Sequence, residues 1–138
     1  MMTAGVLAKK TNVPLYTVRH YTRIGLLTPH RNTQNGYKIY NPSDVTRLRF
    51  IISAKNLGFT LSEINHILDE ANYGNSPCPM VRKIIVKHLE ENKKKIKELQ
   101  NLQKKMEKAV NDWEKMQDSV PDGESVCNLI ESVGEIES

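Results

Sequence analysis

Residues 14–40 read PLYTVRHYTRIGLLTPHRNTQNGYKIY, and this stretch decides the fold. Its first part predicts a short helix, because Pro14 suits a first helical turn and Gly25 suits the position just after a helix ends. Its last part predicts a small β-hairpin, since Asn35 and Gly36 both tolerate the positive φ of a tight turn. A short helix followed by a basic, aromatic hairpin is typical of a module that touches base edges and phosphates together.

A companion helix is predicted on the N-terminal side of this stretch. Thr3 can cap it, it runs to about Lys10, and Val6 and Leu7 are expected to face inward. The helix ends before Pro14, because the residue that precedes a proline avoids the helical region. Two short helices joined by a tight turn are therefore expected ahead of the hairpin.

Two more helices are predicted behind the hairpin. The first spans about residues 42–56 and ends before Gly58. Its core face consists of residues at helical spacing, namely Val45, Leu48, and Ile51 or Ile52. The second spans about residues 60–70 and opens with a capping box, in which Thr60 is the N-cap and Glu63 the third helical residue.

The charge of this 138-residue chain is unevenly distributed, although its net charge is only +4. Residues 1–60 carry a single acid, Asp44, and nine basic residues: Lys9, Lys10, Arg19, Arg23, Arg31, Lys38, Arg47, Arg49 and Lys55. Residues 118–138 carry six acids and neither Lys nor Arg. A basic head suits a polyanion, which would repel the acidic tail. Ordinary surface charge is the alternative interpretation.

The composition argues against a membrane protein. The mean hydropathy is −0.52, and no apolar run approaches the roughly 20 residues that a membrane span needs. The first residues, Met1-Met2-Thr3-Ala4-Gly5, show no basic region followed by an apolar stretch, so no signal peptide is indicated. We therefore expect a cytoplasmic protein.

A long helix with a heptad seam is predicted after a loop at residues 72–77. Apolar and amide residues recur at spacings of four and three: Ile85, Leu89, Asn92, Ile96, Leu99, Gln103, Met106, Val110 and Trp113. Such a helix cannot bury its stripe within its own chain, so it is expected to pair with a second copy; a solvated, Lys-rich helix is the alternative. A last short helix is predicted over residues 126–133. The expected segments are 1–71, 77–117 and 118–138.

Five motifs occur in the order and at the spacing of a known family: residues 3–9, 18–21, 24–27, 35–40 and 57–64. Through them residues 2–70 closely resemble the MerR family of bacterial transcription regulators. The resemblance implies a mainly α fold, with an N-terminal winged helix-turn-helix, a long dimerisation helix that forms an antiparallel coiled coil, and a short C-terminal helix. It also implies a homodimer on double-stranded promoter DNA. A bound effector makes the dimer distort the DNA so that RNA polymerase can engage both promoter elements.

The family's DNA contacts carry over to eight positions of this chain: Thr17, Arg19, Tyr21, Arg31, Tyr37, Lys38, Tyr40 and Lys55. Arg19 is the candidate for a bidentate guanine contact, with a phosphate clamp as the alternative. Tyr40 is equally a candidate for the core of the wing. His20 stands where the family more often has an aromatic residue, which favours a packing role.

The two cysteines, Cys78 and Cys127, are too few for a disulfide framework. In an antiparallel helix pair, Cys78 of one subunit would meet Cys127 of its partner, which gives two equivalent sites per dimer. Resembling sensors of divalent metals use three cysteines, and the middle one aligns with Trp113 here. Four acids are candidates to complete a metal site: Asp112, Asp118, Asp122 and Glu124.

The effector stays open at this point. A thiophilic metal ion (Zn, Cd, Pb, Hg or Cu) is one possibility, and two sulfurs alone suit linear Hg²⁺ or Cu⁺. Thiol oxidation, an organic ligand near Trp113, or no role for the cysteines are the others. An alternative from a different functional class is a coiled-coil interaction protein. Arg31, Lys38 and the wing tyrosines argue against this alternative. An enzyme is not expected, because no Ser/His/Asp set, phosphate loop or HExxH motif occurs.

Overall fold

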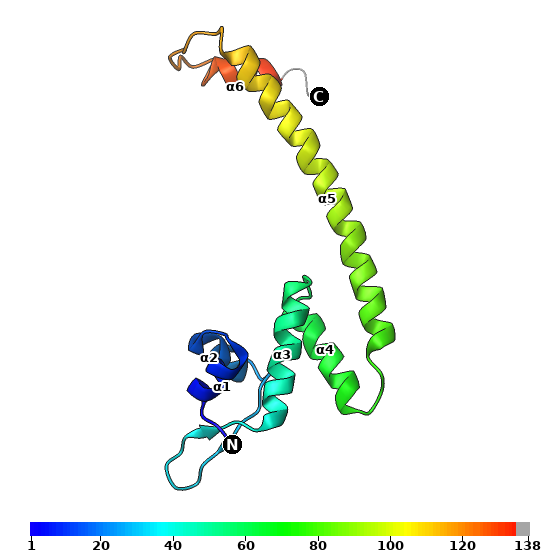
Figure 1. The fold of residues 1–138 in the computed structure, drawn as a ribbon. Helices are drawn as coiled ribbons and strands as arrows, with labels where there is room; N and C mark the ends of the chain where they lie inside the picture. Colours follow the sequence, from blue (N-terminus) through cyan, green and yellow to red (C-terminus); the bar gives the residue numbers. More distant parts are fainter. Residues whose placement is uncertain (135–138) are drawn as a thin grey trace. The chain divides into compact units, whose positions relative to one another are not determined.

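The computed structural model describes residues 1–134, which fold as six helices and one two-stranded hairpin (Figure 1). In chain order the elements are α1 (Ala4–Thr11), α2 (Leu15–Arg23), β1 (His30–Arg31), β2 (Lys38–Ile39), α3 (Pro42–Asn56), α4 (Leu61–Asn72), α5 (Cys78–Trp113) and α6 (Asn128–Gly134). The predicted fold class is confirmed. The chain divides into two compact units, one covering residues 1–88 and the other beginning at Leu89.

Helices α1 and α2 form a helix-turn-helix pair. The Thr3 hydroxyl accepts a hydrogen bond from the Val6 amide at 3.3 Å, as the cap prediction requires. Asn12 ends α1 in the left-handed region, with φ of 58°, which asparagine adopts more readily than most residues. One expectation is wrong: Val6 is 46% exposed, and the inward face of α1 consists of Leu7 and Ala8.

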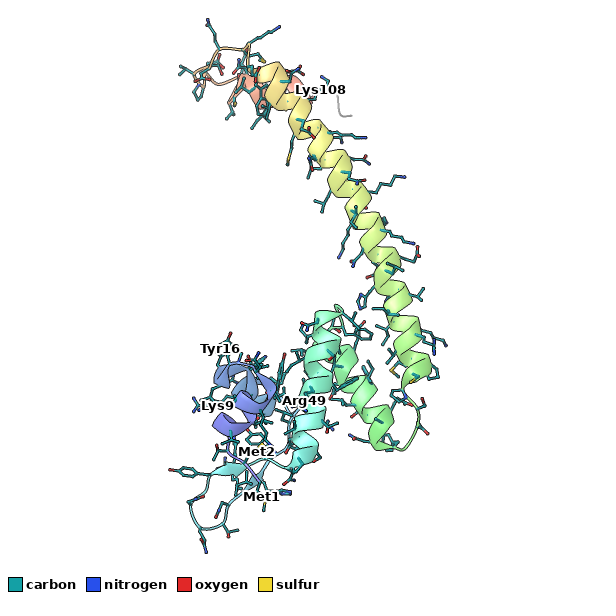
Figure 2. The ribbon with its side chains drawn as sticks, in the orientation of Figure 1. Met1, Met2, Lys9, Tyr16, Arg49 and Lys108 are labelled. Atoms are coloured by element: carbon teal, nitrogen blue, oxygen red, sulfur yellow. The ribbon has the colours of Figure 1, made fainter. Side chains whose placement is uncertain are left out.

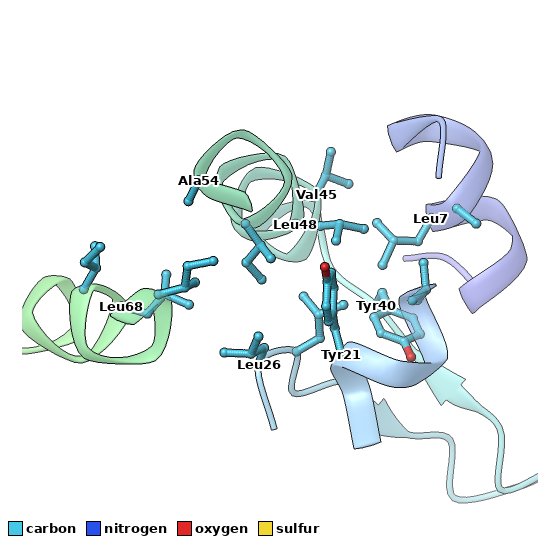
Figure 3. Packing of buried hydrophobic residues seen from close by; sticks show 14 of the residues in the cluster. Leu7, Tyr21, Leu26, Tyr40, Val45, Leu48, Ala54 and Leu68 are labelled. Carbon is cyan, nitrogen blue, oxygen red and sulfur yellow. The ribbon is translucent and has the colours of Figure 1, made fainter. Parts of the chain in front are cut away.

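The core of the first unit lies where α1, α2, α3 and α4 converge (Figure 3). Its largest fully buried side chains are Tyr40, Leu7, Leu27, Leu48, Ile51, Ile64, Ile67 and Val18. Gly25 has φ of 86°, and beyond it the Leu26 amide donates to the Tyr21 carbonyl. This reversal brings Leu26 and Leu27 back into the core, ahead of the hairpin.

The hairpin is a short antiparallel wing in which His30 pairs with Ile39 and Arg31 with Lys38. The Asn32 amide donates to the Tyr37 carbonyl at 2.8 Å, and Gly36 takes φ of 73° in the turn. Asn35, by contrast, keeps a negative φ, so the predicted Asn-Gly turn uses positive φ only at its glycine.

Tyr40 ties the wing to the rest of the head. Its side chain is 1% exposed, and its hydroxyl lies 2.7 Å from the Thr22 hydroxyl of α2. Its backbone forms an isolated antiparallel bridge with Met2, with N···O distances of 2.7 and 2.9 Å. One residue therefore joins the N-terminus, α2 and the end of the wing.

Glu63 connects α4 to the start of α5. Its carboxylate accepts the Thr60 amide at 2.9 Å, and the Thr60 hydroxyl accepts the Glu63 amide at 3.1 Å, so the predicted capping box is confirmed. The same carboxylate lies 2.8 Å from Nε2 of His88 on α5. The hydrogen bond with His88, followed by that from Thr60, holds the pKa of Glu63 below its ordinary value.

The seam of α5 lies open along much of its length. Five of its apolar members are between 52% and 64% exposed: Leu89, Ile96, Leu99, Met106 and Val110. Ile85 and Trp113 are half-buried. Within the described chain, Ala109 is the single buried residue of this 36-residue helix. The isolated chain therefore leaves a long apolar stripe in water, as the heptad pattern predicts.

Replacing Tyr40 by Phe should destabilise the head by about 1 kcal/mol, because the substitution removes the hydrogen bond between the Tyr40 and Thr22 hydroxyls and leaves Thr22 only its bond to the Val18 carbonyl. Urea unfolding measures the loss. Tyr37→Phe is the matched control, since Tyr37 is 68% exposed, and it should unfold like the unchanged protein. Equal stability of the two variants would contradict the hydrogen bond.

Candidate nucleic-acid interface and sensor segment

Helix α2 has one buried face and one open face. Val18 and Tyr21, which are 0% and 9% exposed, face the core. Arg19 and Arg23 are exposed, and Nη2 of Arg23 lies 3.4 Å from Nδ1 of His20. The second helix of the pair thus presents guanidinium groups outward while its apolar face holds it in place.

A basic depression lies between α1, α2 and the wing, with a volume of about 660 Å³. It is lined by Thr3, Ala4, Gly5, Leu15, Arg19, Thr22, Arg23, Arg31, Gly36, Tyr37, Lys38 and Tyr40. Four of these residues carry a positive charge and none is acidic. Arg31 donates through Nη1 to the Gly36 carbonyl at 3.2 Å, which holds its guanidinium along the wing. This concave, cationic surface suits a phosphate backbone.

The structure brings together five of the eight predicted DNA contacts around this depression: Arg19, Arg31, Tyr37, Lys38 and Tyr40. Thr17 is half-buried on α2, and Lys55 is exposed near the end of α3; neither lines the depression. Tyr21 and Tyr40 are buried in the core, at 9% and 1% exposure, which agrees with the core role that was the alternative for Tyr40. A DNA contact by either ring stays a prediction.

Hydrogen bonds order the segment between α5 and α6. Oδ1 of Asp122 accepts the amides of Glu124 and Ser125, both at 2.9 Å. The Glu131 carboxylate accepts the Ser125 hydroxyl and, at 2.8 Å, the Val126 amide. These two bonds hold the pKa of Glu131 below its ordinary value. The predicted helix 126–133 consequently starts only at Asn128, and Val126 is 77% exposed outside it.

Trp113 fastens α6 to the end of α5. Its indole Nε1 donates to the Leu129 carbonyl at 2.9 Å. Nearby, the Asn128 side-chain amide donates to the Gln117 carbonyl at 3.1 Å, and the Asn128 amide donates to the Ser119 hydroxyl at 3.3 Å. Residues 135–138, the end of the predicted third segment, lie outside the described chain.

The two cysteines occupy different units of the chain. Cys78 is the exposed first residue of α5, and its amide donates to the Ser76 hydroxyl at 3.3 Å. Cys127 is half-buried directly before α6.

The predicted oxygen ligands are partly engaged elsewhere. Oδ2 of Asp112 lies 2.9 Å from the ammonium of Lys108, and one oxygen of Asp122 holds the turn at Ser125. Asp118 and Glu124 are exposed. Among residues 1–134, no group of three or more His, Cys, Asp or Glu side chains is placed to hold a metal ion.

Residues 2–71 match the family described as "MerR HTH family regulatory protein", and residues 45–109 match that described as "MerR, DNA binding". The chain belongs to the MerR family. It is similar to a "Mercuric resistance operon regulatory protein" of Bacillus cereus, at 35% identity over 67% of this chain and 70% of that protein. It is also similar to an "HTH-type transcriptional regulator ZntR homolog" of Haemophilus influenzae, at 33% identity over 69% and 70%.

The fold has the same extent as a solved MerR-type structure. The transcription regulator PbrR691 from Ralstonia metallidurans CH34, in complex with lead(II), superposes with a TM-score of 0.75 at 25% identity over 96% of this chain and 99% of that one. This MerR-family protein is accordingly a transcriptional regulator and not an enzyme. Within residues 1–134, no helix is long and apolar enough to cross a membrane.

Two polar residues of α2 line the basic depression but are absent from the sequence-based set. They are Arg23 and Thr22, and the Thr22 hydroxyl also lies 2.7 Å from that of Tyr40. Arg23 follows Arg19 by four positions, so helical spacing alone could have placed both on neighbouring turns of one face. For Thr22 no such signal exists, because its partner lies eighteen residues away.

Trp113→Phe should loosen α6 of this MerR-family protein, because phenylalanine keeps the ring but cannot donate to the Leu129 carbonyl. Loss of one hydrogen bond of about 1 kcal/mol predicts roughly fivefold faster amide exchange in residues 128–134, measured by hydrogen–deuterium exchange. Val120→Ala, at a position 82% exposed, should leave that exchange unchanged. Unchanged exchange in Trp113→Phe would show that α6 is held by other contacts.

Proposed function

We propose that this protein binds double-stranded promoter DNA in the cytoplasm as a homodimer, and activates transcription by distorting that DNA when a thiophilic metal ion binds between its subunits. The observation that carries the proposal is the basic depression in which Arg19 and Arg23 of α2 meet Arg31 and Lys38 of the wing. A recognition helix with an adjacent basic wing reads base edges while it grips phosphates.

The DNA-binding part of the proposal assigns different roles to different side chains. Arg19, exposed near the middle of α2, is placed to read a guanine in the major groove. Arg31, Lys38 and Tyr37, on the wing, contact phosphates. Thr17 and Lys55 supply further phosphate contacts at the edge of the interface.

The dimer follows from the seam of α5. Five apolar side chains lie more than half exposed along one stripe of this helix, and only a second helix can cover such a stripe continuously. Antiparallel pairing places the start of one α5 beside the end of the other. We propose residues 1–71 as the DNA-binding domain, 77–117 as the dimerisation helix and 118–138 as the sensor segment.

The metal part of the proposal rests on the two thiols, on the likeness to a mercuric resistance operon regulatory protein, and on the likeness to a regulator solved in complex with lead(II). Cys78 of one subunit and Cys127 of the other form each site, and a bound thiophilic ion supplies a link between the two chains. Trp113 fills the place of a third cysteine and donates to the Leu129 carbonyl, so it offers no ligand. The site therefore favours two-coordinate Hg²⁺ or Cu⁺, unless Asp118, Asp122, Glu124 or Asp112 adds an oxygen for Zn²⁺, Cd²⁺ or Pb²⁺.

A second candidate effector is oxidation of the same thiols. The exposure of Cys78 at the start of α5 favours it, because a thiol there is open to oxidants. In either case RNA polymerase is the proposed partner at the distorted promoter. Deformation of the DNA changes the spacing between the two promoter elements that the polymerase recognises.

Arg19→Ala should weaken binding to a selected operator by roughly 1–3 kcal/mol while changing binding to random DNA much less. Fluorescence anisotropy on both duplexes at one salt concentration measures the ratio. Arg82→Ala is the charge-matched control, because Arg82 is exposed on α5, and it should keep the ratio. An unchanged ratio in Arg19→Ala would make Arg19 a phosphate contact.

Cys78→Ser should abolish the response to metal and leave operator affinity intact, because Cys78 lies on α5 and outside the basic depression. Titration of the reduced protein with Zn²⁺, Cd²⁺, Pb²⁺, Hg²⁺ and Cu⁺ follows the thiolate-to-metal charge-transfer band. Saturation at two ions per dimer is expected, lost equally in Cys127→Ser and kept in Ser76→Ala. Metal affinity no tighter than that of a free dithiol would favour thiol oxidation as the signal. Loss of operator affinity in Cys78→Ser would contradict the proposal that the head binds DNA and the cysteines bind the effector.

A further inference from the structure

The outward direction of α2 is set by its buried face. At 3.6 residues per turn, Tyr16 and Arg23 lie roughly 180° around the helix from the midpoint of Val18 and Tyr21. Val18 and Tyr21 are the buried residues of α2. Tyr16 and Arg23 therefore occupy the centre of the open face, and Arg19 stands to one side of it.

Tyr16 is an aromatic side chain left in water on this face. It is 74% exposed, and Figure 2 shows it projecting from the outer side of α2. Among the described residues its phenol has no hydrogen-bond partner and its ring stacks on no other ring. Leu15, its apolar neighbour, is half as exposed at 36% and lines the basic depression instead.

The position of Tyr16 along the helix matters as much as its exposure. It is the second residue of α2, which begins at Leu15, and helical side chains lean toward the N-terminus. In helix-turn-helix proteins, the N-terminal residues of the second helix contact base edges. Arg23 is the last residue of the same helix, so the face carries an aromatic ring at one end and a guanidinium at the other.

We propose that Tyr16 reads thymine, with its ring against the 5-methyl group of one thymine in each half-site of the operator. The methyl is the apolar group that a base pair offers in the major groove, and apolar side chains recognise it by contact. Arg23, at the other end of the same face, holds the helix close to the phosphates. The inference rests on the proposed function, because it requires that α2 enters the major groove of DNA.

The test begins with selection of an operator from random duplexes by the full-length protein. Binding of that operator is then measured for Tyr16→Ala, which removes the ring, and Tyr16→Phe, which removes only the hydroxyl. Tyr73→Ala is the matched control, since Tyr73 is 83% exposed and follows α4. Each thymine of the operator is finally replaced in turn by deoxyuridine, which lacks the 5-methyl group.

We expect Tyr16→Ala to lose about three- to tenfold in affinity for each half-site, and Tyr16→Phe and Tyr73→Ala to stay within twofold. One symmetric pair of thymines should weaken the unchanged protein when replaced by deoxyuridine and should not weaken Tyr16→Ala further. Circular dichroism verifies that the variants are folded.

Three results would overturn the inference. Tyr16→Ala could bind within twofold, every deoxyuridine could weaken both proteins equally, or Tyr16→Phe could lose as much as Tyr16→Ala, which would assign the hydroxyl to a phosphate. Failure of the proposed function is distinguishable from these results. In that case the unchanged protein selects no operator at all, and the inference about Tyr16 falls with it.

Discussion

The hydrogen bond between the Tyr40 and Thr22 hydroxyls is the interaction on which the basic surface of the head depends. Tyr40 is almost fully buried, its hydroxyl meets α2 at Thr22, and its backbone pairs with Met2 in both directions. The wing contains only two residues in each strand, and an isolated two-stranded hairpin is marginally stable in water. Anchoring the end of β2 in the core gives Arg31 and Lys38 a defined position beside Arg19.

The arginines of the head differ in what their side chains contact. Arg47 is half-buried and donates to the Leu26 carbonyl at 2.7 Å, so this cation of the basic head supports the fold. Arg19, Arg23 and Arg31 remain open to solvent. A count of positive charges alone overstates the cations that are free to meet a polyanion, because some satisfy carbonyls inside the protein.

The segment between α5 and α6 shows how side-chain hydrogen bonds keep the C-terminal helix in order. Trp113, Asp122 and Glu131 hold the backbone around Cys127 through side-chain hydrogen bonds to Leu129, Ser125 and Val126. This part is therefore organised by the chain's own polar groups. Because the segment is already ordered, it loses less conformational entropy when Cys127 helps to bind a ligand.

By itself the sequence determined where several helices of the head begin or end, because caps and turn residues act over three or four positions. Its five ordered motifs determined the family. Thr3, the Thr60–Glu63 box and Gly25 lie where their local chemistry predicts. Only the tertiary structure decided which tyrosines serve the core and which face solvent. Tyr21 and Tyr40 are buried while Tyr16 and Tyr37 are open, since burial depends on contacts such as Thr22–Tyr40 that join residues far apart in the chain.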